Sequence, residues 1–108
     1  MQTLRQVFKI EDQERKDGIL EILSDKYCRD ILQSIMDKSK SAVELTAECS
    51  IPMSTVYRRI QTLHDNKLVR TSGTITDDGK RLFLYKSKIK GIHSSFNDGK
   101  TEVELILN

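Results

Sequence analysis

The sequence predicts an α+β fold in which a three-helix core is followed by two β-hairpins. Two observations predict it. Amphipathic helical patterns, interrupted by a turn at Pro52, fill residues 25–65. After them the motif Asp-Gly-Lys occurs twice, at 78–80 and 98–100, each time between runs of β-forming residues, which is a strong signal for a hairpin turn. The length of 108 residues is that of one domain.

The first predicted helix covers residues 25–37. Ser24 is a suitable N-cap, and a carboxylate in the first turn suits the helix dipole. Before this helix Gly18 punctuates the chain, residues 19–23 read as a short apolar turn, and the pattern of residues 1–17 fits a strand, a helix or a frayed end. Apolar side chains with helical spacing form the inner stripe of the helix, namely Tyr27, Cys28, Ile31, Leu32, Ile35 and Met36.

A second, shorter helix starts with a capping box, in which Ser41 and Glu44 satisfy each other's backbone amides. Residues 50–52 then form a tight turn, because proline cannot continue a helix but can begin the next one. Ile51 is placed to fill the space between the two helices, which is the arrangement of a helix-turn-helix. The candidate inner positions of the short helix are Val43, Leu45, Thr46 and Cys49.

The third predicted helix, residues 52–66, separates into two faces. Arg58 lies nearly opposite the apolar stripe at about 100° per residue, and the polar face around it carries no acid before Asp65. An ordinary solvated helix face usually mixes Glu with Lys, so this composition favours a surface that meets an anion. The apolar stripe consists of Met53, Val56, Ile60 and Leu63.

The polar face holds side chains of the types that recognise nucleic acid. Arginine pairs with guanine and glutamine with adenine, while hydroxyls and helix N-terminal amides bind phosphates. We expect base-reading contacts from Arg58, Gln61, Ser54 and Tyr57. We expect contacts to the DNA backbone from Thr55, Arg59, Thr62, Arg70, Lys80 and Arg81.

The first hairpin is predicted over residues 68–88. The side chains of Lys86, Lys88 and Lys90 alternate, so in a regular strand they share one face. Such a row either contacts phosphates or protects an exposed strand edge from aggregation. Both interpretations fit the sequence equally well.

The second hairpin is predicted to join residues 92–96 to residues 101–107. On its first strand Ile92, Ser94 and Phe96 point the same way. Gly91 marks a bend or bulge between the two hairpins. One face of this hairpin is expected to be buried because its second strand carries an alternating apolar row, namely Val103, Leu105 and Leu107.

Positive charge is concentrated in the middle of the chain. Nine basic and three acidic residues lie between Pro52 and Lys90, a net charge of +6, so the rest of the chain carries −4. This segregation makes the third helix and the first hairpin the candidate surface for a polyanion.

The sequence shows no phosphate loop, catalytic triad, metal-ligand cluster or paired-carboxylate motif. We therefore expect no enzymatic activity, no cofactor, no metal and no small-molecule effector. Cys28 and Cys49 are isolated and are expected to be reduced, buried thiols, while redox or effector sensing through them stays open. No secretory signal and no apolar run of roughly 20 residues is present, so we expect a cytoplasmic protein outside the membrane.

Several segments resemble winged-helix regulators. Ile51-Pro52-Met53-Ser54-Thr55-Val56-Tyr57-Arg58-Arg59-Ile60, Leu63 and Lys67-Leu68-Val69 resemble their recognition helix and first wing strand, and residues 24–36 resemble their first core helix. The similarity is greatest to the bacterial and archaeal arsenic-repressor-like (ArsR-like) group and covers residues 19–87. It implies a winged helix-turn-helix, here with an additional C-terminal β-hairpin in place of the group's dimerisation helix. Metal-sensing members carry paired cysteines in the helix corresponding to residues 42–49, where this chain has only Cys49.

The resemblance and the basic polar face together predict a homodimeric, sequence-specific transcriptional regulator of double-stranded DNA. Recognition helix 52–66 is expected in the major groove and wing 68–88 on the backbone. The expected organisation is an N-terminal extension over residues 1–18, a winged helix-turn-helix over 19–90 and a C-terminal hairpin available for dimerisation over 91–108.

The alternative is a protein-interaction winged helix within a transcription or RNA-processing complex. Such a helix is expected to expose aromatic or aliphatic anchors, and Tyr57 is the single candidate. RNA is disfavoured because its major groove excludes a helix and because readers of single strands need aromatic platforms.

Overall fold

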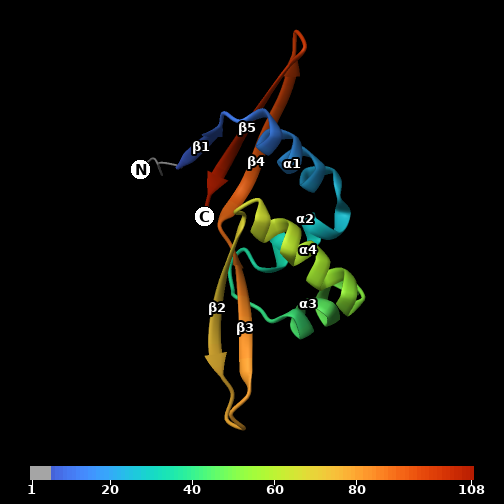
Figure 1. Cartoon of the computed structure of the whole chain (residues 1–108), viewed down its shortest axis with the longest axis vertical. Helices are drawn as coiled ribbons and strands as arrows, with labels where there is room; N and C mark the ends of the chain where they lie inside the picture. Colours follow the sequence, from blue (N-terminus) through green and yellow to red (C-terminus); the bar gives the residue numbers. More distant parts are fainter. Residues whose placement is uncertain (1–5) are drawn as a thin grey trace.

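The computed structural model describes residues 6–108, and over this range the chain forms four helices and five strands (Figure 1). The helices lie in the middle of a molecule that extends 56 Å along its longest axis, and one β-hairpin projects at each end (Figure 1). This architecture confirms the predicted α+β class, a winged helix-turn-helix with an additional C-terminal hairpin. In chain order the elements are β1 (Val7–Ile10), α1 (Gln13–Ser24), α2 (Lys26–Ser34), α3 (Ala42–Cys49), α4 (Met53–Asp65), β2 (Val69–Ile75), β3 (Arg81–Ser87), β4 (Ile89–Asn97) and β5 (Lys100–Leu107).

The N-terminal part of the chain contains two elements, β1 and α1, that the sequence patterns left unassigned. Strand β1 pairs antiparallel with β5, and α1 is capped by Asp12, whose carboxylate accepts the Arg15 amide at 2.9 Å. The predicted break at Gly18 and the turn at 19–23 are wrong, because α1 runs through both. A Cβ at Gly18 would lie 2.6 Å from Oδ1 of Asn66, so the glycine allows α1 to approach the end of α4. The predictions for residues 1–5 lie outside the described residues.

Helix α2 is shorter than predicted, and Ser24 is not its N-cap. Ser24 is the last residue of α1, where its hydroxyl donates to the Glu21 carbonyl at 2.8 Å. Asp25 caps α2 instead, since its carboxylate accepts the Cys28 amide at 3.0 Å. A single extended residue therefore separates two helices.

The helix-turn-helix formed by α3 and α4 agrees with the prediction in its turn and its cap. The capping box of Ser41 and Glu44 is present, and Ile51 is buried between the helices. Val43 was wrongly assigned to the inner face, because α3 buries Ala42 and Leu45 and leaves Val43 exposed.

The end of α4 leads directly into the β2–β3 hairpin, which we call the wing. Lys67 adopts the left-handed conformation, and the Leu68 amide donates to the Leu63 carbonyl at 2.9 Å, which is a Schellman motif. At the other side of the wing, Lys40 and Tyr85 exchange backbone hydrogen bonds of 3.0 and 2.8 Å. The base of the wing is thus attached to the helical core on both sides.

The second sheet has the strand order β1-β5-β4 and packs against α1. Of the predicted inward row, Val103 and Leu105 are buried and Leu107 is half-buried, and the register shifts between Ile89 and Gly91 as a bulge there requires. Phe96 lies on the same strand face as Ile92 but is 72% exposed, because it stands near the tip of the hairpin. None of the helices within residues 6–108 is long and apolar enough to cross a bilayer.

Candidate nucleic-acid interface

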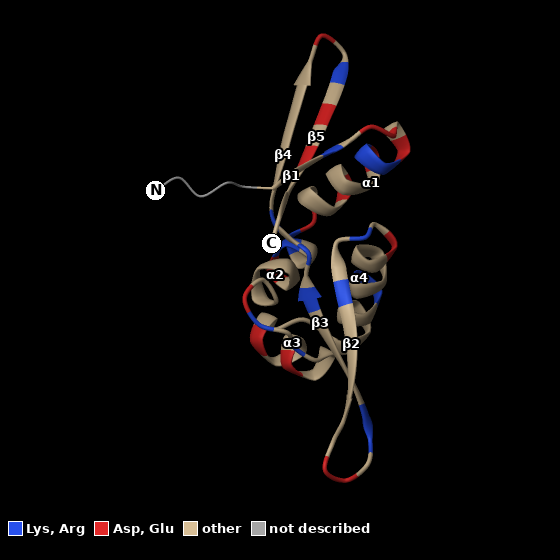
Figure 2. Cartoon of the chain, turned by 90° about the vertical axis from the view of Figure 1, so that its left-hand side faces the viewer, with Lys and Arg blue, Asp and Glu red and all other residues tan. Residues whose placement is uncertain are grey.

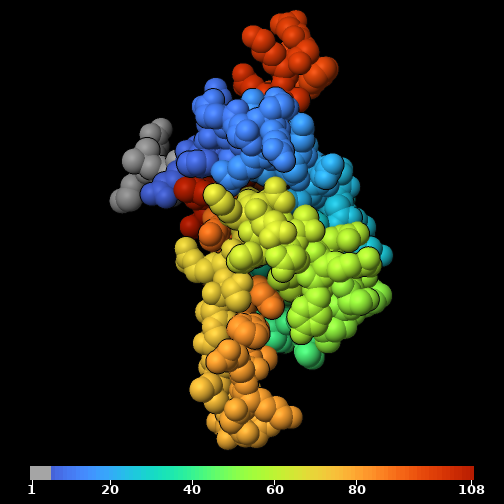
Figure 3. Space-filling model, in the orientation of Figure 1, coloured from blue at the N-terminus to red at the C-terminus, as the bar shows by residue number. Residues whose placement is uncertain are grey.

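Helix α4 and the wing form a joint surface on one side of the molecule. The space-filling view shows the yellow-green side chains of α4 next to the gold and orange side chains of the wing (Figure 3). The α4 stripe of Val56, Ile60 and Leu63 is buried, as predicted, whereas Met53 lies at its edge and is partly exposed. The polar face of α4 therefore points to solvent.

Arg58 occupies the middle of this polar face. Its side chain is exposed, and none of the four ion pairs formed among residues 6–108 involves it. Ser54 and Tyr57 are exposed beside it. Three of the four predicted base-reading side chains are thus open to a ligand.

Gln61, the fourth predicted base reader, is exposed but already engaged. Its amide donates to the Asp65 carboxylate one helical turn away at 2.8 Å. Thr62 is engaged in a similar way, because its hydroxyl donates to the Arg58 carbonyl at 3.1 Å. Gln61 has to release Asp65 before its amide can pair with a base.

The N-terminus of α4 offers backbone amides to an anion. Pro52 is the N-cap, and within the part of the chain that the structure describes no side chain caps this helix end. Ser54 is exposed and Thr55 half-buried in the first turn. The free amides and the helix dipole favour a phosphate at this position.

Arg59, a predicted phosphate contact, is engaged within the fold. Its Nε donates to the Asp25 carboxylate at 2.8 Å, and its guanidinium lies 5.6 Å from the centre of the Tyr27 ring. Burial raises the pKa of Asp25, but the hydrogen bonds from Cys28 and Arg59 outweigh burial and the net pKa lies below the usual value. Arg59 therefore fastens α4 to the start of α2.

The basic residues of the wing lie on two faces. Arg81 pairs with Ile75 and shares its face with Phe83 and Tyr85, whereas Arg70 pairs with Lys86 on the opposite face. Of these six residues, Tyr85 is buried and Lys86 is half-buried, and the other four are exposed. The six predicted backbone contacts therefore do not share one surface.

The predicted row of Lys86, Lys88 and Lys90 is not a regular strand face. The chain leaves the wing after Ser87 and enters the second sheet at Ile89, so Lys86 belongs to the wing, Lys88 to the link and Lys90 to the second sheet. The Lys86 ammonium donates to the Asp37 carbonyl at 3.2 Å. The prediction was wrong because it treated residues 86–90 as one continuous strand. The alternation of lysines does not reveal the link between the two sheets.

The charge on the wing changes sign near its tip. Figure 2 shows basic residues along the wing strands and acidic residues at the tip. Lys80 lies 3.9 Å from Asp78, with both side chains exposed, and Thr76 binds Asp78 and the Lys80 backbone within the turn. The basic residues of the strands and Lys80 are therefore suited to an anion, whereas Asp77 and Asp78 are not.

A groove between α4 and the wing contains residues that the sequence reasoning did not select. The groove has a volume of about 330 Å³, and Tyr57 lines it from α4 together with Phe83 and Tyr85 from β3. Burial, with a smaller effect of Tyr57, raises the pKa of the Tyr85 phenol. The alternation of Arg81, Phe83 and Tyr85 is the signal that could have placed them on one strand face.

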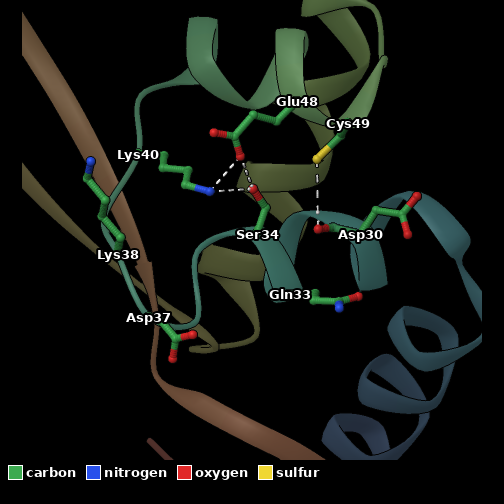
Figure 4. Close-up of a pocket in the computed structure, with 8 residues that line it drawn as sticks. All are labelled: Asp30, Gln33, Ser34, Asp37, Lys38, Lys40, Glu48 and Cys49. Carbon is green, nitrogen blue, oxygen red and sulfur yellow. Dashed lines mark hydrogen bonds and ion pairs between the residues drawn. The ribbon is translucent and has the colours of Figure 1, made fainter.

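A larger and more polar hollow lies between α2 and α3, away from this surface (Figure 4). Here Lys40 pairs with Glu48, and both bind the Ser34 hydroxyl. The hydrogen bonds from Lys40 and Ser34 lower the pKa of Glu48. These charged groups satisfy one another and join the end of α2 to α3.

The two cysteines are unpaired. Burial and a hydrogen bond to Asp25 raise the pKa of the Cys28 thiol to about 12, and burial also raises the pKa of Cys49. Cys49 is only half-buried, in contrast to the prediction. Across residues 6–108 no group of three or more His, Cys, Asp or Glu side chains is placed to hold a metal ion.

The fold and the arrangement of α4 and the wing define a winged helix-turn-helix. Residues 23–72, which span the end of α1 through the first half of β2, match the family of helix-turn-helix domains. Among solved structures the chain is similar to one described as a possible transcriptional regulator from Methanosarcina mazei Go1, with 20% sequence identity, a TM-score of 0.56, and coverage of 77% of this chain and 76% of that chain. At this identity the likeness shows a shared fold. No match was found among curated proteins.

Proposed function

We propose that this protein is a transcriptional regulator that binds double-stranded DNA through α4 and the wing. The observation that carries the proposal is the exposed guanidinium of Arg58, which projects opposite the buried stripe of α4 and has no carboxylate partner within residues 6–108. An arginine of this kind on an exposed helix donates a bidentate pair to guanine in the major groove. The helix-turn-helix match over residues 23–72 supports the proposal.

In this proposal the residues divide into two roles. Arg58, Ser54 and Tyr57 contact base edges, and Gln61 joins them after releasing Asp65. The amides at the start of α4, with Thr55 and Thr62, position the helix against phosphates. The wing adds Arg81 on the α4 side and Lys80 at its turn, and Arg70 reaches the backbone from the opposite face.

We also propose a homodimer that places two copies of α4 in successive major grooves, about 34 Å apart. The edge strands β1 and β4 of the second sheet are the surfaces for pairing with another copy. The resemblance of residues 19–87 to ArsR-like regulators supports placement in that group and action in the cytoplasm. Light scattering of the purified protein tests the dimer, and a monomer at binding concentrations would contradict it.

Selection of a preferred duplex from random-sequence DNA tests the proposal, with affinities measured by fluorescence anisotropy at two salt concentrations. We expect Arg58→Ala to weaken the selected duplex by about 1–3 kcal/mol at one base position and to relax the preference there. Lys100→Ala removes an exposed charge at the turn of the other hairpin and is the matched control, with binding expected to stay unchanged. Equal affinity of Arg58→Ala and wild type for the selected duplex would remove the base-reading role.

A further inference from the structure

The groove between α4 and the wing continues along the wing itself. A second hollow of about 330 Å³, lined by Gly73, Ile75, Arg81 and Phe83, meets the first at the shared Phe83. We call the combined feature the aromatic trough and define it by Tyr57, Phe83, Tyr85, Gly73, Ile75 and Arg81. Each part lies at the lower end of the roughly 300–1,000 Å³ typical of small-ligand pockets.

The trough stays open because a glycine faces its central aromatic ring. Gly73 pairs directly with Phe83, and among the described residues no atom lies within 4 Å of a Cβ added at Gly73. Phe83 is consequently 46% exposed, and Tyr57 across the groove is 53% exposed. Large exposed apolar groups gathered in one hollow mark a binding site rather than an ordinary surface.

The charges around the trough indicate an anionic, aromatic ligand. Arg81 lines the wing side, and no acidic residue lines either hollow within the described part of the chain. Gln61 and His64 line the first hollow, and His64, joined by Gln61 once its amide releases Asp65, can meet the edge of a base. Aromatic side chains that can stack on a base, beside a cation that can contact a phosphate, are the composition of sites for unpaired nucleotides.

We propose that the aromatic trough stacks one unpaired base of the DNA strand that α4 contacts. This inference rests on the proposed function, because α4 brings the strand to the trough. In a fully paired duplex the faces of each base are covered by its neighbours, so the base that enters the trough has left the helical stack. The protein therefore prefers DNA in which a base beside its site is already unpaired.

Three forms of one mixed-sequence 24-mer test the inference, with affinities measured by fluorescence anisotropy at a fixed salt concentration. The forms are the paired duplex, the same duplex with a three-base mismatched bubble, and the single strand. We expect the bubble to bind at least about fivefold more tightly than the duplex, the lower end of what stacking one base on an aromatic ring contributes. With 5-iododeoxyuridine in the bubble, irradiation is expected to crosslink the DNA to Phe83 or Tyr57, as read by mass spectrometry.

Matched variants separate stacking from general binding. Phe83→Leu keeps an apolar side chain and is expected to abolish the preference for the bubble with duplex affinity within about twofold of wild type, while Phe83→Tyr is expected to retain the preference. Phe96→Leu removes an exposed phenylalanine on the other hairpin and is expected to behave as wild type. Circular dichroism of each variant checks that the wing is folded.

The outcomes separate this inference from the proposed function. Equal binding of duplex and bubble, or a preference that survives in Phe83→Leu, overturns the aromatic trough as a base site while duplex binding stands. Such a result would fit a trough that contacts another protein. Absence of duplex binding overturns the proposed function, and a bubble preference that depends on Phe83 would then still support the trough.

Discussion

Asp25 and Arg59 join the N-cap of α2 to α4. One carboxylate oxygen of Asp25 accepts both the Cys28 amide at 3.0 Å and the Arg59 Nε at 2.8 Å. Arg59 is the chain neighbour of Arg58, and the helical period that turns Arg59 toward Asp25 turns Arg58 toward solvent. In the proposed function, the two adjacent arginines thus have separate tasks, one in stability and one in binding.

Arg59→Ala is expected to lower the free energy of unfolding by about 1–3 kcal/mol, because it removes a charged hydrogen bond and leaves the Asp25 carboxylate partly buried without its partner. Arg58→Ala is expected to change it by less than about 0.5 kcal/mol, since its side chain is exposed and free of ion pairs within residues 6–108. Urea unfolding followed by circular dichroism measures both. Equal effects of the two substitutions would refute the division of tasks.

The contact between Asp25 and Arg59 also predicts that the stability of the fold depends on pH. Its pKa is lower in the folded chain than the value of 3.8 expected when unfolded, so the unfolded state takes up the proton first as the pH falls. The stabilisation is therefore complete above about pH 5 and is lost as the pH falls through the native pKa. Asp25→Asn keeps a capping side chain but does not titrate. In thermal melts, the difference in stability between this variant and wild type is therefore expected to shrink as the pH falls from 6 to 3. A constant deficit over this range would contradict the assignment.

The two Asp-Gly-Lys turns give a matched pair for testing the wing. Lys80→Ala is expected to weaken binding of all duplexes alike and to reduce the slope of log affinity against log salt concentration by about one. Lys100→Ala changes the same residue at the corresponding turn of the other hairpin and is expected to leave the slope unaltered. Anisotropy titrations at four salt concentrations measure the slopes. If both variants shift the slope equally, the wing has no special part in binding.

Thiol reactivity tests whether either cysteine is suited to redox sensing. The pKa of about 12 leaves Cys28 almost entirely protonated at pH 8, and its side chain is buried. Iodoacetamide is expected to modify half-buried Cys49 slowly and Cys28 hardly at all in the native protein, and both in urea. Intact-mass spectrometry over time resolves the two additions. Rapid labelling of Cys28 under native conditions would show that the thiol is more accessible than its burial indicates.

Local rules were sufficient to predict the helix-turn-helix. The capping box at Ser41, the buried turn residue Ile51 and the helical spacing of the α4 stripe each depend on neighbours a few residues away. The Asp-Gly turns depend on equally local geometry. The exposure of Arg58 follows from the same helical period.

These local rules do not predict contacts between residues that are far apart in the sequence. Arg59 and Asp25 are 34 residues apart, and either alone reads as a surface charge. Strand β1 is short, and its pairing with β5 defines it as a strand. Gly18 looks like a helix break in the sequence, and its role becomes clear only from its contact with the end of α4. The aromatic trough depends on the register that sets Gly73 opposite Phe83, which a strand prediction does not specify.

Only Lys88 separates the wing strand β3 from β4, and Ser87 closes this junction with a hydroxyl that donates to the Ile89 carbonyl at 2.7 Å and accepts the Ile89 amide at 3.2 Å. Because side chains alternate along an extended chain, one residue inserted here would turn β4 over, exposing its inward face and burying its outward one. The length of this link therefore fixes which face of β4 points inward relative to the strands of the wing. A single added residue would remove this fixed orientation of one hairpin relative to the other.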